Sequence, residues 1–302
     1  MAPVNLQKSD PFISPRALAR IANLELVARR VVEGFITGLH QSPYHGFSVE
    51  FAEHRPYLPG DPIRHIDWKV YARTDRYVIK RFQEETNLKA YLLLDTSASM
   101  GFSSSDFNKL NYGAHLAAAL AYLMLEQRDA VGLALFDDRI RTLLPPKSVR
   151  SYLGMILAEL ERTQPAGKTG VGGALHHLAE RMKRRGLVLL ISDLMDEPRE
   201  ILSGLKHFRW DGHEVIVFHV LDPLEITFAF QQDARFRDLE TDEILVTQPW
   251  HLRQAYRRAM NGFLDEIKAG CRENGVDYAL FETNRPYDYA LMEYLNKRKK
   301  LY

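Results

Sequence analysis

Three polar residues follow one apolar run at alternate positions in the segment KAYLLLDTSASMGF, which begins at residue 89. They are Asp95, Ser97 and Ser99. In a loop that leaves a strand, the first, third and fifth residues can turn their side chains toward one point. Magnesium takes oxygen ligands in near-octahedral geometry at about 2.0–2.1 Å. One carboxylate and two hydroxyls supply oxygens with little negative charge, so the segment predicts a Mg²⁺ or Mn²⁺ site that still accepts water or an incoming carboxylate.

Two further segments carry oxygen ligands in suitable places. Thr169 lies in the glycine-rich stretch QPAGKTGVGGAL, just before an expected helix, and Asp193 ends the apolar run LVLLISD. Together with Asp-Thr-Ser-Ala-Ser at residues 95–99, they resemble the metal ion-dependent adhesion site of a von Willebrand factor A domain. The resemblance implies that Asp95, Ser97, Ser99, Thr169 and Asp193 hold the metal. Each residue alone is equally well explained as a helix cap or turn residue, but all three segments in this order favour the metal.

The elements that position these residues alternate between strands and helices from about residue 88. Residues 90–95, 186–192 and 213–221 are almost continuously apolar, as strands covered on both faces are. The pattern predicts an α/β fold, with a doubly wound, mostly parallel sheet and helices on both faces. The resemblance makes this fold von Willebrand factor A-like. Ligands bind such sheets at the carboxyl ends of the strands, where Asp95 and Asp193 fall.

The other expected elements complete this pattern. A strand pair is expected at 130–136 and 139–145, turning at Asp137 and Asp138. Shorter strands are expected near 236–239 and 244–246, and a last strand at 276–282. Helices are expected at 108–127, 149–162, 172–185, 198–208, 249–274 and 287–297.

An N-terminal helix and a short β segment precede this domain. Residues 14–36 have apolar residues at helical spacing behind a Ser-Pro start, and YVIKRFQEE at residues 77–85 has strand character. We expect residues 1–86 to pack on the main domain, residues 87–302. The segment 57–85 is expected to form a salt-bridged flap that packs Trp68 against that domain. A docking surface is the alternative, because Arg and Trp are enriched at interface hot spots.

The same segment also carries a family resemblance, through Gly60-Asp61, Arg64, Asp67-Trp68, Arg73 and Lys80. With AVGLALF and VDYALFETNRPYDYALMEYL, these residues resemble a bacterial family of unknown function that has a von Willebrand A-like domain. Members of that family are typically encoded beside AAA+ ATPases of the MoxR type. The resemblance covers about residues 40–300. It implies a MoxR-type ATPase as partner, in the assembly or activation of other proteins.

Composition limits the class of protein. The 302 residues carry a net charge of +1, which gives no overall attraction to nucleic acid. A single cysteine, Cys271, leaves no intrachain disulfide and no cysteine-based zinc site. The longest apolar run, residues 116–125, is far shorter than the roughly 20 residues that cross a bilayer. We therefore expect a cytoplasmic protein without a transmembrane segment.

Two phosphate chemistries are disfavoured by spacing. The stretch GKT at residues 167–169 lacks the glycine that a P-loop requires five positions before Gly167, where Arg162 stands. An aspartyl-phosphate enzyme of the haloacid dehalogenase type would need an acid two residues after Asp95, where Ser97 stands.

Three functions remain. The first is a non-enzymatic module whose Mg²⁺ accepts an Asp or Glu of a partner protein. The second is a Mg²⁺-dependent, phosphoesterase-like hydrolase with the metal as Lewis acid and a neighbouring acid such as Asp106 as base. The third is a purely structural ion. We favour the first and expect no catalytic residues, because a site with so few protein charges suits an outside carboxylate.

Overall fold

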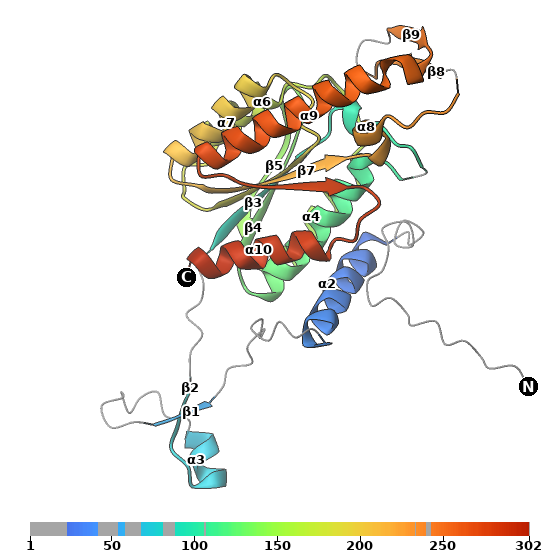
Figure 1. The fold of residues 1–302 in the computed structure, drawn as a ribbon. Coiled ribbons are helices and arrows are strands. Elements are labelled where there is room, and N and C mark those ends of the chain that lie inside the picture. Colours follow the sequence, from blue (N-terminus) through green and yellow to red (C-terminus); the bar gives the residue numbers. More distant parts are fainter. Residues whose placement is uncertain are drawn as a thin grey trace, which may run out of the picture.

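A six-stranded sheet forms the centre of the protein (Figure 1). The computed structural model describes residues 23–41, 54–57, 68–80, 88–105, 107–232, 234–239 and 243–301. The strand order is β10-β7-β6-β3-β4-β5. Strand β5 is antiparallel to β4, and the other neighbours are parallel, which confirms the predicted doubly wound α/β fold. The strands are β3 (Lys89–Asp95), β4 (Ala130–Phe136), β5 (Ile140–Lys147), β6 (Leu187–Ser192), β7 (Glu214–Leu221) and β10 (Asp277–Glu282).

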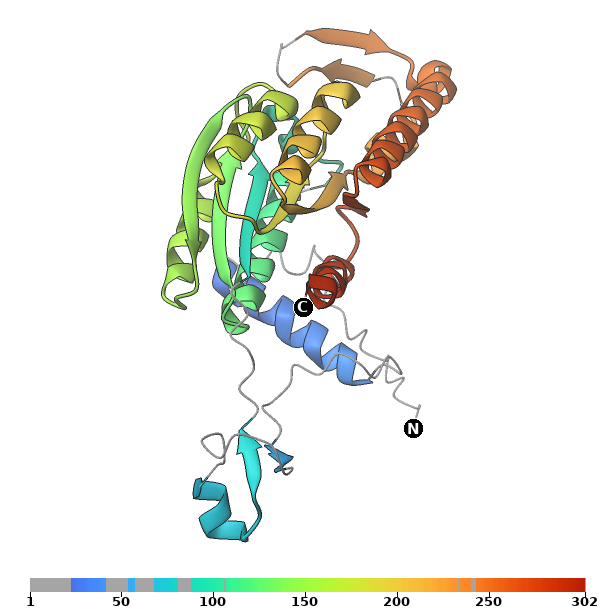
Figure 2. The ribbon, with the colours of Figure 1, turned by 90° about the vertical axis from the view of Figure 1, so that its left-hand side faces the viewer.

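Helices cover both faces of the sheet (Figure 2). The core on one face is formed with α4 (Lys109–Glu126) and α10 (Asp288–Leu301), and α2 (Leu24–Gln41) and α5 (Tyr152–Arg162) join it by packing on α4. The other face packs against α6 (Val171–Arg181), α7 (Pro198–Trp210) and α9 (Pro249–Glu273). Alternate residues of each strand serve the two cores: Leu92 and Leu94 point into the first, Tyr91 and Leu93 into the second.

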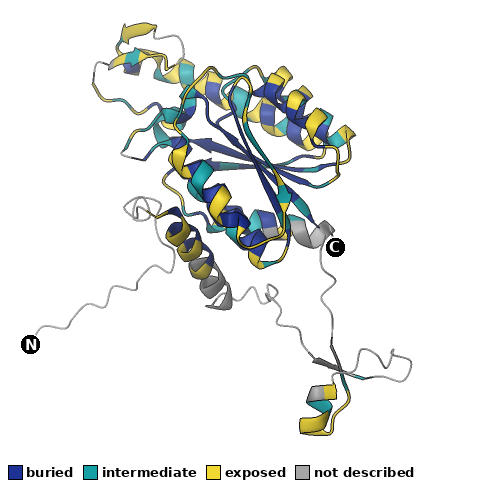
Figure 3. Cartoon of the chain, turned by 180° about the vertical axis from the view of Figure 1, so that it is seen from behind, coloured by how far each residue is buried: buried dark blue, intermediate teal, exposed yellow. Residues whose placement is uncertain are grey.

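Double coverage explains the continuous apolar runs. Every residue of β6 is buried, and the sheet forms a buried layer between half-exposed helices (Figure 3). Helix α4 is apolar almost all round, because α2 and α5 pack against the side that does not face the sheet. This arrangement accounts for the run at residues 116–125. No helix in the described ranges is long and apolar enough to span a bilayer.

The N-terminal helix packs on the main domain. Its buried residues, Leu24, Val27, Ala28, Val31 and Val32, belong to the same core as α4. The predicted start at residue 14 lies outside the described residues, and the helix continues to Gln41, beyond the predicted end at residue 36.

A small β unit includes parts of the segment 57–85, which carries the family resemblance. Strands β1 (His54–Pro56) and β2 (Val78–Lys80) pair antiparallel, with α3 (Trp68–Thr74) between them in the sequence. Trp68, which we expected to pack against the main domain, is 54% exposed and meets the ring of Tyr71 edge-on at 6.0 Å. Residues 58–67 and 81–87 lie outside the described residues. The division at residues 86 and 87 stays a prediction.

Strand β1 and helix α3 were not predicted, and neither were two short elements near the carboxyl ends of the main-sheet strands. A 3-10 turn covers Ala98–Gly101, directly after β3, and α8 (Pro223–Thr227) follows β7. A hairpin of β8 (Ala234–Arg237) and β9 (Ile244–Thr247), close to its predicted position, stands at the same end of the sheet as α8 (Figure 1).

Candidate metal centre

Asp95 and Asp193 are carried by adjacent central strands. Asp95 is the last residue of β3, Asp193 directly follows β6, and the two strands pair in parallel, with Leu94 opposite Ile191. From β3 the chain continues to β4 on one side, while β6 lies on the other. Such a switch point opens the crevice in which doubly wound sheets bind ligands. Both carboxylates are fully buried, at the place that the sequence indicated.

Three hydroxyls form a chain beside these acids. The Oγ atoms of Ser97 and Ser99 are 2.9 Å apart, and Ser99 Oγ lies 3.4 Å from Thr169 Oγ1. Residues 70 positions apart in the sequence therefore meet at one point. The structure thus brings together the three hydroxyls that the sequence pattern singled out.

Backbone hydrogen bonds hold the Thr169 loop in place. Ala166 N donates to Thr96 O at 2.9 Å, and Ala98 N donates to Gly167 O at 3.2 Å. Gly167 has φ +84°, a backbone conformation that favours glycine, and a Cβ there would collide with the carboxylate of Asp137. Asp137 turns the β4–β5 connection, as predicted, and is ion-paired with Arg141.

The carboxylate of Asp95 is hydrogen bonded but not charge-compensated. Ser97 N donates to Oδ1 at 2.9 Å, and Ser192 Oγ donates to Oδ2 at 2.6 Å. In the part of the chain that the structure describes, no cationic side chain forms an ion pair with Asp95. Burial, followed by the charge of Asp193, raises the pKa of Asp95 to about 7.

A buried lysine compensates Asp193. Lys109, the first residue of α4, is fully buried, and its Nζ donates to Asp193 Oδ2 at 2.7 Å and to Glu225 Oε1 at 2.5 Å. Burial alone would lower the pKa of Lys109, but Asp193 and Glu225 outweigh it and raise that pKa, so the ammonium stays charged. Sequence reasoning missed Lys109 and Glu225. The position of Lys109 could have indicated an acidic partner, because a cation in the first turn of a helix is unfavourable.

A buried histidine fixes the backbone of Asp193. The ring of His219, on β7, lies 2.8 Å from the carbonyl oxygen of Asp193 through Nε2 and 2.8 Å from the hydroxyl of Tyr278 through Nδ1. Because the carbonyl only accepts, Nε2 carries the proton and Nδ1 accepts from Tyr278. Burial lowers the pKa of His219 to about 4, which keeps the ring neutral. Sequence reasoning missed His219 as well, although a histidine inside the apolar run EVIVFHVL was a visible irregularity.

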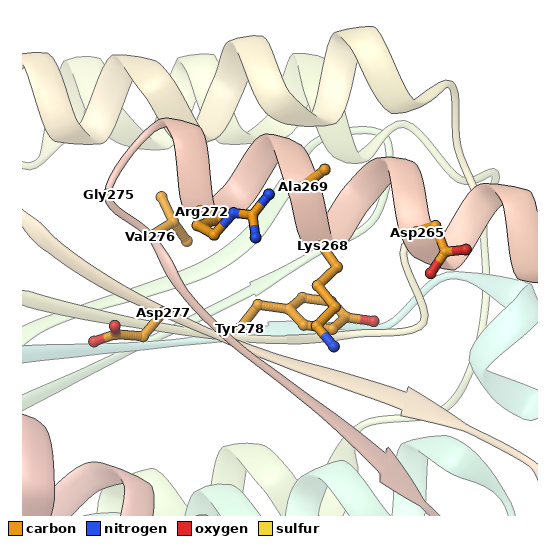
Figure 4. A pocket seen from close by; sticks show the side chains of 8 residues that line it. All are labelled: Asp265, Lys268, Ala269, Arg272, Gly275, Val276, Asp277 and Tyr278. Atoms are coloured by element: carbon orange, nitrogen blue, oxygen red, sulfur yellow. The ribbon is translucent and has the colours of Figure 1, made fainter.

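Tyr278 also lines a groove at the edge of the sheet (Figure 4). The groove has a volume of about 500 Å³ and lies between α9 and β10, with Lys268 and Arg272 along one wall. It therefore lies on the flank of the domain, beside the outermost strand, and not among the loops that carry the hydroxyl chain.

The residues present fit a hard divalent cation. Asp95, Asp193 and Glu225 carry three negative charges when ionised, and Lys109 supplies one positive charge, which leaves two to balance. The hydroxyls of Ser97, Ser99 and Thr169 add neutral oxygen ligands of the kind that Mg²⁺ accepts. No group of three or more His, Cys, Asp or Glu side chains in the described ranges is arranged to hold a metal, so a cation at this site would depend on the two aspartates together with the three hydroxyls. Asp106, considered as a catalytic base, lies outside the described residues.

Known proteins resemble this chain in sequence and in fold. Uncharacterized proteins of Mycobacterium tuberculosis and Mycobacterium bovis are each 26% identical over 292 residues, which covers 95% of this chain and 91% of theirs. The crystal structure of the conserved hypothetical protein BatB from Bacteroides thetaiotaomicron has a TM-score of 0.50 and 20% identity, covering 70% of this chain and 99% of that one. The VWA domain of SpRpn10 has a TM-score of 0.40 and 11% identity, covering 68% and 93%.

The likeness to BatB shows the fold alone. The family, however, follows from the sequence: the model of the protein family of unknown function DUF58 matches residues 53–262, more than two thirds of the chain. That match includes β3, the hydroxyl chain, β6 and α8. The chain therefore belongs to the DUF58 family.

Proposed function

We propose that this chain is a protein-interaction module that holds Mg²⁺ or Mn²⁺ and binds an acidic residue of a partner protein through it. Asp95, Ser97, Ser99, Thr169 and Asp193 would hold the metal. The observation that carries the proposal is the buried carboxylate of Asp95, which has no cationic partner among the described residues and adjoins a chain of three hydroxyls. When bound, the metal supplies a Lewis-acidic position for a carboxylate oxygen of the partner.

The surrounding groups support binding over catalysis. Both ring nitrogens of His219 are engaged, and Glu225 accepts from Lys109 and from the backbone of Asp222. A general base needs a free position that can accept a proton from the substrate. The nitrogens of His219 and the oxygens of Glu225 already take part in hydrogen bonds within the protein. His219 therefore orients Asp193, and Lys109 and Glu225 balance the charge at the site.

The family resemblance extends the proposal to the partner. Relatives with this signature are typically encoded beside MoxR-type AAA+ ATPases, so we propose such an ATPase as the cytoplasmic partner, in the assembly or activation of other proteins. The carboxylate that reaches the metal would come from that ATPase or from a protein on which both act. The metal contact gives specificity, and the surrounding surface supplies the remaining affinity.

Thermal melts test the metal site. With a dissociation constant of about 1 mM, roughly 10 mM Mg²⁺ should stabilise the protein by about 1.4 kcal/mol over EDTA, a shift of about 2–4 °C. Ser99→Ala should remove the response at little cost to the fold, because its hydroxyl is only half-buried. A Mg²⁺ response that survives in both Ser99→Ala and Asp95→Asn would show that the metal binds elsewhere.

A capture experiment tests the partner. Immobilised protein is incubated with the purified MoxR-type ATPase in Mg²⁺ or in EDTA, with Asp95→Asn as the matched variant. We expect retention in Mg²⁺ that is lost both in EDTA and in the variant. Equal retention under all three conditions would mean that the ATPase binds a surface other than the metal site.

A further inference from the structure

Lys109 is a positive charge built into the wall of the proposed metal site. Its ammonium contacts Asp193 at 2.7 Å and Glu225 at 2.5 Å, and it lies 5.7 Å from the centre of the Phe102 ring. A lysine side chain on the surface could turn its ammonium away into solvent, but Lys109 is fully buried. The ammonium is therefore a permanent part of the electrostatic field at the site.

The groups around Lys109 are themselves fixed. Glu225 also accepts from Asp222 N at 2.8 Å, and the side chain of Asp222 caps α8 by accepting from Leu224 N at 2.8 Å. Asp222 further accepts from the backbone N and the hydroxyl of Ser104, both at 2.9 Å. These bonds tie α8 to the loop that follows β3. Lys109 is thus held between two acids, Asp193 and Glu225, that are themselves hydrogen bonded to the backbone.

We infer that Lys109 sets the charge of the site so that the metal stays receptive to an outside carboxylate. This inference rests on the proposed function. With Lys109 present, a divalent ion balances the protein's charges, and an incoming carboxylate adds to a neutral site. Without Lys109, the protein would hold the ion more tightly, and an incoming carboxylate would meet a site that is already negative. Lys109 therefore weakens metal binding and favours partner binding.

The repulsion between the Lys109 ammonium and a nearby metal ion is strong enough to change the metal affinity in this way. A tenfold change in affinity corresponds to about 1.4 kcal/mol. Two unit charges about 5 Å apart at an effective dielectric of about 20 exceed that value. Removing the ammonium should thus change the dissociation constant of a divalent ion by tenfold or more.

Mn²⁺ titration of four proteins tests the first half of the inference. Lys109→Met should bind Mn²⁺ at least tenfold more tightly than the wild type, and Glu225→Gln at least threefold more weakly. The double variant K109M/E225Q restores the charge balance and should return to within about threefold of the wild type. Lys168→Met is the matched control, because Lys168 adjoins Thr169 but is exposed, so solvent screens its charge and the affinity should change less than threefold.

Acetate titration of the Mn²⁺-loaded proteins tests the second half. Water proton relaxation reports the water on bound Mn²⁺, and a carboxylate that displaces it lowers the signal. Acetate should lower the relaxation enhancement of the wild type at concentrations at least tenfold below those needed for Lys109→Met. A structural role alone would not make metal and carboxylate affinities move in opposite directions.

The outcomes separate this inference from the function on which it rests. A wild type that binds no Mn²⁺ refutes the metal site itself. A wild type that binds Mn²⁺, with Lys109→Met equal or weaker, refutes the charge-setting role and leaves the metal site standing. If Lys109→Met does not fold, Glu225→Gln decides alone, and unchanged or tighter Mn²⁺ binding in that variant overturns the inference.

Discussion

Asp95→Asn should stabilise the metal-free protein, although it replaces a fully buried, hydrogen-bonded side chain. The pKa of Asp95 is raised from 3.8 in the unfolded chain to about 7 in the folded protein. The ionised carboxylate therefore destabilises the folded state at pH values above 3.8. Three pKa units correspond to about 4 kcal/mol at pH 8. Asparagine keeps the bond from Ser97 N but disturbs the one from Ser192, at a cost of about 1 kcal/mol. The expected net gain is about 3 kcal/mol.

Urea denaturation at pH 8 in EDTA measures this gain. The sign follows from the raised pKa: the cost of the charge is fully present above pH 7 and falls away as the pH drops toward 3.8. The advantage of Asp95→Asn should therefore shrink between pH 8 and pH 5. Excess Mg²⁺ should reduce or reverse it, because only the wild type would gain from the metal.

Asp137→Asn is the matched control. Asp137 is also a buried aspartate at this end of the sheet, but Arg141 compensates it. Burial is the largest single influence and would raise the pKa of Asp137, but the hydrogen bonds from Arg141 and the Arg139 backbone, with the charge of Arg141, together outweigh it and lower that pKa. This variant should lose about 1–2 kcal/mol. If Asp95→Asn were also destabilised in EDTA at pH 8, the carboxylate would have to be compensated after all, and the reasoning for a divalent cation would fail.

Four further variants test other parts of the structure. Burial lowers the pKa of His115 to about 4, so this side chain should contribute a loss of about 3 kcal/mol as the pH falls from 6.5 to 4, and His115→Gln should remove that contribution from the pH–stability curve. Tyr278→Phe leaves Nδ1 of His219 without its donor and should cost about 1–2 kcal/mol in urea denaturation, where no change would contradict the hydrogen bond between Tyr278 and His219. Gly172→Ala places a Cβ 2.6 Å from that of Glu200 and should cost about 1–3 kcal/mol in the same assay. In the same helix, Gly173→Ala meets no atom within 4 Å and should stabilise the protein by about 0.5–1 kcal/mol, so equal effects would refute close packing of α6 on α7.

The sheet and the positions of the candidate site residues could be predicted from the sequence because local patterns determine them. Continuous apolar runs identify strands with two covered faces, and the residue that ends such a run lies at the carboxyl edge whatever the loops do. For this reason Asp95 and Asp193 were placed correctly. Thr169 followed from its position between a glycine-rich loop and a helix, and the structure brings its hydroxyl to 3.4 Å from that of Ser99.

The charge environment could not be predicted in the same way. Lys109 opens a helix whose next turns are strongly apolar, and a lysine at such a position normally reaches into solvent. Its burial depends on Glu225, which comes from a five-residue helix with no periodic signal and lies 116 positions away. Trp68 is the reverse case. Its size and type suggested burial, yet it is half-exposed beside Tyr71.

The pairing of β3 with β6 makes one half of the site stiff and leaves the other half adjustable. Asp95 ends β3 and Asp193 directly follows β6, next to the last paired residues of these two central strands, and His219 holds the Asp193 carbonyl, so the sheet limits how far the two acids can move apart. Thr169 belongs to a loop that two backbone hydrogen bonds join to the segment after β3. Mg²⁺ requires ligand distances of about 2.0–2.1 Å, whereas Ca²⁺ requires about 2.3–2.6 Å. An ion of larger radius would therefore displace the Thr169 loop and not the acids, and selection between ions by size would depend on how firmly those two bonds hold.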